Sequence, residues 1–224
     1  MTEADWNSCT DPRKMLTFLR SSGRVSDRKS RLWMVACCRM VWHVLPDERS
    51  RTAVAVAERF ADGLASESEL YDAEGVAWET VEQLDGGPIP VEHAARAAAW
   101  ACYPPQASQY NKDAATAVAL EAERATEGQG IPWVQTAARQ ADLLRDLFGP
   151  LPVRPMWIDP SWRTPTVVAL AQTVYESRRS DDLPILADAA EEAGCTDARL
   201  LEHLRSPGLH ARGCFALDAV LSKS

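Results

Sequence analysis

The chain has 224 residues, 46% of them apolar, and a net charge of −8, which are ordinary values for a globular protein. A chain of this length buries enough surface to fold without a metal ion or disulfide bonds. The charge is uneven, because residues 61–130 carry 3 Lys and Arg against 13 Asp and Glu, a net charge of −10. We expect an acidic surface there, which excludes contact with a nucleic-acid backbone through this third of the chain.

The first helix signal is Asp11-Pro12, a capping carboxylate followed by a proline at the first helical position. The stretch 20–31 is the one dense basic segment. No aromatic residues are interleaved in it, so we expect a solvated loop and first helical turn instead of a nucleic-acid site.

Residues 32–45 are apolar at 12 of 14 positions, yet they include Arg39 and His43. The run is too short to span a membrane and predicts a helix buried on most sides. A buried cation must be paired, so an internal network with an acidic cap such as Asp27 or Asp47 is the favoured interpretation. The alternative is that Arg39 and His43 line a pocket for an anion or substrate.

The remaining segments also read as helices. Asp47 starts a helix that Gly63 stops, and Ser66 with Glu69 forms a capping box. Further helices are expected over 91–103, 107–127, 132–148, 165–175, 184–194, 196–204 and 210–221. No run resembles a β-strand. We therefore predict an all-α protein, one irregular bundle of nine to ten helices that forms a single domain over 1–224, with a proline-rich strap at 149–165 packed across it.

A possible metal site consists of Cys195, His203, His210 and Cys214, whose residue types suit tetrahedral zinc. His210 and Cys214 are four residues apart and would share a helix face. The spacings fit no standard zinc motif, however, and Cys214 continues into an apolar stripe, so a core position is the favoured interpretation. We accordingly predict no cofactor.

The chain contains no Walker loop, dinucleotide fingerprint, zinc-protease or serine-hydrolase motif. The leading hypothesis is therefore a non-enzymatic protein-interaction or adaptor domain. The alternative is an enzyme or a protein that binds a small molecule or a metal, with a site built from Arg39, His43, His203 and His210. This alternative requires the N-terminal helix and the C-terminal segment to meet.

Partners and compartment follow from the tryptophans and cysteines. Partly exposed indoles often anchor interfaces, and Trp6, Trp157 and Trp162 are expected to be the most exposed of the eight tryptophans. We expect a protein partner or self-association, and neither nucleic acid nor membrane as a partner. The six cysteines form no C-x-x-C pair and no signal peptide is recognisable, which favours a reducing cytoplasm.

Several blocks together resemble a group of uncharacterised, all-helical bacterial proteins. They are Met1-Thr-Glu-Ala-Asp-Trp6 with Cys9-Thr-Asp-Pro12 and Met15-Leu16, Ser26-Asp-Arg-Lys29, Val35-Ala-Cys-Cys-Arg39 with Trp42-His43, Leu143-Leu-Arg-Asp146 to Phe148, Leu183-Pro-Ile-Leu-Ala-Asp188, Glu191-Glu-Ala-Gly-Cys195 and His210-Ala-Arg-Gly-Cys214. The blocks extend over most of the chain, and Phe215 stands where the group usually has Trp. The group has no assigned activity, so the resemblance implies an intact bacterial protein and no catalytic residues.

Overall fold

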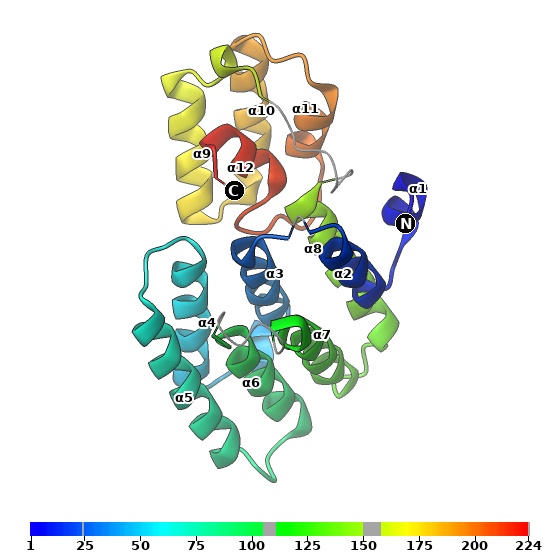
Figure 1. The fold of residues 1–224 in the computed structure, drawn as a ribbon, viewed down its shortest axis with the longest axis vertical. Coiled ribbons are helices and arrows are strands. Elements are labelled where there is room, and N and C mark those ends of the chain that lie inside the picture. Colours follow the sequence, from blue (N-terminus) through cyan, green and yellow to red (C-terminus); the bar gives the residue numbers. More distant parts are fainter. Residues whose placement is uncertain (24, 105–110, 150–157, 224) are drawn as a thin grey trace. The chain divides into compact units, whose positions relative to one another are not determined.

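A computed structural model describes residues 1–23, 25–104, 111–149 and 158–223, with the side chains of 111–113 excepted. The described part is all-α, as the sequence predicts, and contains no β-strand (Figure 1). It has twelve α-helices where nine to ten were expected. A helix over Glu3–Ser8 is among those that were not anticipated. None of the helices in the described ranges combines the length and the apolar character that crossing a bilayer requires.

The contacts divide the chain into two compact units, Met1–Leu144 and Arg145–Ser224. The prediction of a single domain stays a prediction, and each unit is described by itself. The predicted strap at 149–165 lies for the most part outside the described residues. Its described end forms a short 3-10 helix, η2 (Pro160–Trp162), capped by Asp159.

The first unit is organised around α3. This helix contacts α4, α6 and α7, and α6 packs along α7 through alanines that allow the two axes to come close. The elements of this unit are α1 (Glu3–Ser8), α2 (Pro12–Ser21), α3 (Asp27–Met40), η1 (Trp42–Val44), α4 (Glu48–Ala61), α5 (Glu67–Gln83), α6 (Ile89–Ala101), α7 (Asn111–Glu127) and most of α8 (Trp133–Phe148).

The helix ends of this unit follow the sequence signals. The Asp11 carboxylate accepts hydrogen bonds from two backbone amides of the first turn of α2, and Ser66 and Glu69 form both bonds of a capping box on α5. Gly63 follows α4 with a φ of +71°, a left-handed conformation that favours glycine. These predictions are confirmed.

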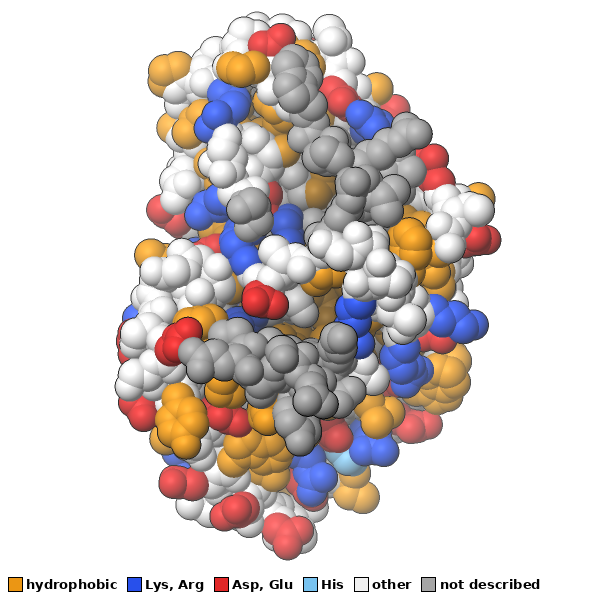
Figure 2. All heavy atoms as spheres, in the orientation of Figure 1, with side chains coloured by type: hydrophobic (Ala, Val, Ile, Leu, Met, Phe, Trp, Pro, Cys, Tyr) orange, Lys and Arg blue, Asp and Glu red, His pale blue; other side chains and the backbone are white. Residues whose placement is uncertain are grey.

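The acidic side chains of the stretch 61–130 are exposed chiefly on α5, whereas Glu121 and Glu123 on α7 are buried. Figure 2 shows acidic side chains gathered over the part of this face where α5 runs, and that helix exposes Glu67, Glu69, Asp72, Glu79 and Glu82. The basic stretch 20–31, which continues into the first turns of α3, is not a free patch. Arg28 pairs with Asp62 at 3.1 Å, and Arg31 is buried.

The second unit is a smaller bundle built from the end of α8 and from α9 (Pro165–Ser177), η3 (Ser180–Asp182), α10 (Leu183–Glu192), α11 (Ala198–Arg205) and α12 (Phe215–Leu221). In Figure 1, α12 is the short red helix that contacts both α9 and α11. The core of this unit contains apolar side chains from α9, α10, α11 and α12, among them Val167, Tyr175, Leu186, Leu204 and Leu217.

Candidate metal centre

The first pair of predicted site residues lies in the first unit. Arg39 pairs with Glu58 at 3.1 Å and stacks on the ring of Trp42, so the partner is neither of the acidic caps expected. His43 is not in a buried helix, because α3 ends at Met40. It is exposed, and its Nε2 lies 2.7 Å from the side-chain oxygen of Gln129.

The second pair, His203 and His210, comes together in the second unit with their ring centroids 4.9 Å apart. Arg39 and His43 belong to the other unit, so a site that combines all four residues stays a prediction. The histidines are joined instead by Asp146 and Cys214. One potential ligand atom from each of these four residues lies within 4.8 Å of all the others.

The four side chains come from three separate parts of the chain. Asp146 is in the last turn of α8, His203 is in α11, and His210 and Cys214 lie on either side of a turn before α12. Little of the cluster is exposed. The exposed side-chain fractions are 3% for Asp146, 6% for His210 and 18% for His203, and Cys214 is fully buried.

Local backbone chemistry places each segment. Asp197 caps α11 by accepting the amide hydrogens of Arg199 and Leu200, so the helix expected over 196–204 begins at Ala198. Pro207 cannot continue that helix, and it restricts Ser206, which is extended at φ −71° and ψ 134°. His210 is consequently in a loop and not on a helix face with Cys214, contrary to the sequence interpretation.

A turn then returns the chain into the cluster. The Cys214 amide donates to the carbonyl oxygen of Ala211 at 3.0 Å, and Gly213, third in this turn, has a φ of +85°. Only glycine adopts that conformation readily. The Cys214 side chain makes no capping hydrogen bond to α12, and its Sγ lies 3.0 Å from His203 Nε2.

Asp146 is the centre of the polar contacts. Its Oδ1 lies 3.2 Å from His203 Nε2 and 3.0 Å from His210 Nδ1. Its other oxygen, Oδ2, accepts the backbone amide of Ala211 at 2.7 Å. One carboxylate oxygen is thus held by the backbone while the other faces both imidazoles.

Each ring nitrogen of His210 lies within hydrogen-bonding distance of an oxygen atom. Nε2 lies 3.2 Å from the carbonyl oxygen of Ser206, which can only accept, so this nitrogen carries a hydrogen. In a neutral ring, Nδ1 would then present a lone pair to the carboxylate oxygen of Asp146. Two electron-rich atoms at 3.0 Å require a cation between them, either a proton on His210 or a metal ion.

The pKa values reflect this balance of burial and charge. Burial alone would raise the pKa of Asp146, but hydrogen bonds from His203, His210 and the Ala211 amide outweigh it and hold that pKa below its usual value. Burial likewise opposes the charged form of His210, yet the bond and charge of Asp146 raise its pKa.

The sequence interpretation named three of the four clustered residues and missed Asp146. Cys195, the fourth expected ligand, lies in the apolar core, 3% exposed and outside the cluster. Leu143, Leu144 and Leu147 are buried on α8, so an aspartate among them was a usable signal of a buried partner. That block also belongs to the resemblance, but nothing in it pointed to a ligand.

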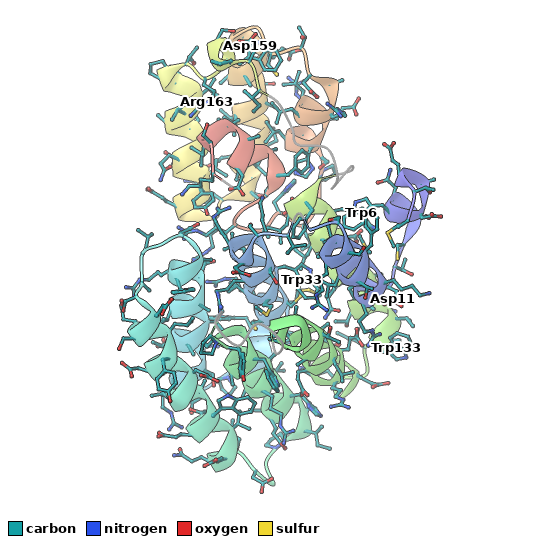
Figure 3. The ribbon with its side chains drawn as sticks, in the orientation of Figure 1. Trp6, Asp11, Trp33, Trp133, Asp159 and Arg163 are labelled. Atoms are coloured by element: carbon teal, nitrogen blue, oxygen red, sulfur yellow. The ribbon has the colours of Figure 1, made fainter. Side chains whose placement is uncertain are left out.

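The predicted interface tryptophans have different outcomes. Trp6 is 1% exposed and its ring lies 6.2 Å from that of Phe18, so its expected exposure is wrong. Trp162 is partly buried against the core of the second unit, and Trp157 lies outside the described residues. Trp133 is the exposed tryptophan that sequence reasoning missed, with 45% of its surface accessible; Figure 3 labels it on α8.

A comparison of the chain with protein-family models, with curated proteins and with solved structures finds no match in any of the three. The resemblance to the uncharacterised bacterial group therefore stays a prediction. A proposal for the function therefore depends on the geometry of the cluster.

Proposed function

We propose that this protein binds one transition-metal ion of the zinc class through Asp146, His203, His210 and Cys214. The observation that carries the proposal is the convergence of one ligand atom from each residue within 4.8 Å. Zinc bonds of about 2.0–2.3 Å in a tetrahedron place neighbouring ligand atoms about 3.3–3.8 Å apart. The three contacts of 3.0–3.2 Å would open by a few tenths of an ångström on metal binding, and the wider separations, up to 4.8 Å, would close by about 1 Å.

The contacts of the ligands support a metal over a catalytic triad. In a Cys-His-Asp triad the acid holds one ring nitrogen while the thiol meets the other. Here Asp146 and Cys214 both approach Nε2 of His203, which is the arrangement of ligands that point to a common centre. Cys214 is also fully buried and has no access to a substrate.

The surroundings of His210 favour the same conclusion. A metal-bound histidine usually donates its other N–H to a carbonyl or carboxylate, which fixes the ring. His210 does this through Nε2 and the Ser206 carbonyl, which leaves Nδ1 directed at the cluster.

The ligand set selects the class of ion. Mg²⁺ and Ca²⁺ prefer oxygen ligands, whereas a thiolate with two imidazoles suits Zn²⁺ and its neighbours. Four protein ligands complete a tetrahedron and leave no position for a substrate, so the proposed ion is structural. His203, as the most exposed ligand, provides the route of entry.

Substitution with Co²⁺ tests the proposal. We expect one equivalent of Co²⁺ to give the visible bands of tetrahedral coordination together with sulfur-to-cobalt charge transfer, and Zn²⁺ to displace it. Cys214→Ser should remove the charge-transfer band, whereas Cys195→Ser should leave the spectrum unchanged. Absence of the band from the wild-type protein would refute the site.

Two predictions from the sequence accompany this proposal. All six cysteines are free thiols, and a thiolate ligand persists best in a reducing compartment, so we propose a cytoplasmic location. A protein partner also remains a proposal. Its aromatic anchor would be Trp133 with the adjacent Val134, which is 51% exposed, instead of Trp6.

A further inference from the structure

We propose that metal occupancy controls whether the C-terminal segment Ser206–Lys223 stays docked on the rest of the second unit. The inference rests on the proposed function and concerns its regulation. Two of the four ligands, His210 and Cys214, lie on this segment, and the other two, Asp146 and His203, lie on α8 and α11. The ion would therefore join the segment to α8 and α11.

The segment has little structure of its own. Its helix, α12, has only seven residues, and isolated helices shorter than about 12–15 residues are marginal in water. No side chain caps the start of α12, because Cys214 occupies that position and its thiol faces the cluster. The segment is ordered by what it packs against.

The metal-independent contacts are concentrated beyond the cluster. Five side chains of α12 are buried, and Arg163 donates through Nε to the carbonyl oxygen of Val220 at 2.8 Å. Arg212 and Lys223 both stack on the ring of Tyr175, at 4.6 Å and 4.7 Å. Figure 3 labels Arg163, which lies near the start of α9. These contacts favour docking of the segment, and the one made by Arg212 belongs to the loop before α12.

The loop itself depends on the cluster. Between Ser206 and Cys214 the loop contacts α8 through His210 and the Ala211 amide, and both of these contacts are made to Asp146. With the ion removed, Asp146, His210 and Cys214 are buried polar groups joined by hydrogen bonds, including those of His203 and the Ala211 amide, and no longer by bonds to an ion. Each such hydrogen bond contributes less than a bond to the metal, so removal of the ion loosens the loop.

The first unit supplies no ligand and so serves as an internal control. Removal of the ion should loosen the segment while helices such as α6 keep their protection. Release of the segment exposes Phe215 and Leu217, both 9% exposed or less, and bares the faces of α9 and α11 that α12 covers. Metal availability would thereby set how much apolar surface this end of the chain presents.

Hydrogen exchange of the full chain, read by mass spectrometry, tests this control. The zinc-loaded protein and the same protein stripped with a chelator are compared. Exchange over 206–223 should become at least about 10-fold faster after stripping, and exchange over α6 should not change. Equal exchange over 206–223 in the two states, with one equivalent of zinc bound before stripping, overturns this inference and leaves the metal site intact.

Two variants complete the design. Cys214→Ser should show the fast exchange even with zinc present, and Cys195→Ser should respond to the chelator as the wild type does. A protein that binds no zinc at all refutes the proposed function itself. If Cys214→Ser fails to fold, Asp146→Asn takes its place with the same expected result.

Discussion

Zinc-dependent stability of the second unit gives the sharpest quantitative test of the metal centre, with Cys214→Ser as the perturbation. Serine is close in size to cysteine and keeps a hydrogen-bonding atom near His203 Nε2, 3.0 Å from the present sulfur. In metal-free protein we expect a loss of about 1 kcal/mol, because a hydroxyl is more costly to bury than a thiol. Cys195→Ser replaces an equally buried cysteine of the same unit and should lose a similar amount.

The stabilities of the two variants should respond differently to zinc. An ion that binds only the folded state stabilises it by about 1.4 kcal/mol for every tenfold rise of free zinc above its Kd. Loss of the thiolate should weaken binding at least as much as the roughly 10–100-fold that loss of a supporting contact brings. At saturating zinc, Cys214→Ser should therefore be about 3–4 kcal/mol less stable than wild type, and Cys195→Ser about 1 kcal/mol.

The assay is urea unfolding at a series of buffered free zinc concentrations. It is followed by hydrogen exchange of α10, because that helix lies within the second unit and contains no ligand. The free energy of unfolding is plotted against the logarithm of free zinc. A gap between the wild type and Cys214→Ser that stays at its metal-free value of about 1 kcal/mol at every zinc concentration would refute the reasoning, since it would show that Cys214 contributes nothing to zinc affinity.

Three further predictions concern the framework around the site and the first unit. Arg31→Met should lower the free energy of unfolding by about 2–4 kcal/mol in thermal unfolding, because Arg31 donates to the carbonyl oxygens of Ala101 and Tyr103 at the end of α6. The control is Arg49→Ala, whose side chain is exposed and whose loss should leave the stability almost unchanged. Glu123→Gln should raise the melting temperature at pH 7, because burial raises the pKa of this carboxyl and ionisation then opposes folding. That gain should disappear as the pH falls below about 4.5, where Glu123 is protonated in both states. Gly149→Ala should destabilise the second unit by about 1–2 kcal/mol in urea unfolding, because Gly149 has a φ of +82° and an added Cβ would lie 3.4 Å from the Phe215 ring. Gly208→Ala is the control: an added Cβ there meets no other atom within 4 Å, so this variant should be as stable as the wild type in the same assay.

Helix type and helix starts could be predicted from the sequence because their causes are local. A cap such as Asp11, or the Ser66–Glu69 box, needs only the first turn of its own helix to satisfy the free amide groups. Helix ends were harder to predict. The apolar run 32–45 continues past Met40 without a glycine or proline, so periodicity alone gave no reason for His43 to leave the helix.

The composition of the site could be predicted only in part, for a different reason. His210 and Cys214 look like helix neighbours by spacing, and the structure separates them by a turn that depends on Gly213 at a positive φ. Asp146 precedes His203 by 57 positions, and nothing local to α8 indicates which later segment will contact it. When tertiary packing brings a residue to a site from a distant part of the chain, no regular sequence spacing identifies that residue.

The same long-range assembly explains why a closed metal site is compatible with a chain that has no metal motif. Zinc motifs of short spacing occur where one small loop must supply most ligands and the ion replaces a missing core. Here the second unit already has an apolar core from α9 to α12, and the polar cluster lies where α8, α11 and the loop before α12 meet. Since this core already includes α12, the proposed ion would only have to hold the loop that precedes it. Its four ligands can then be as dispersed in sequence as the helices are.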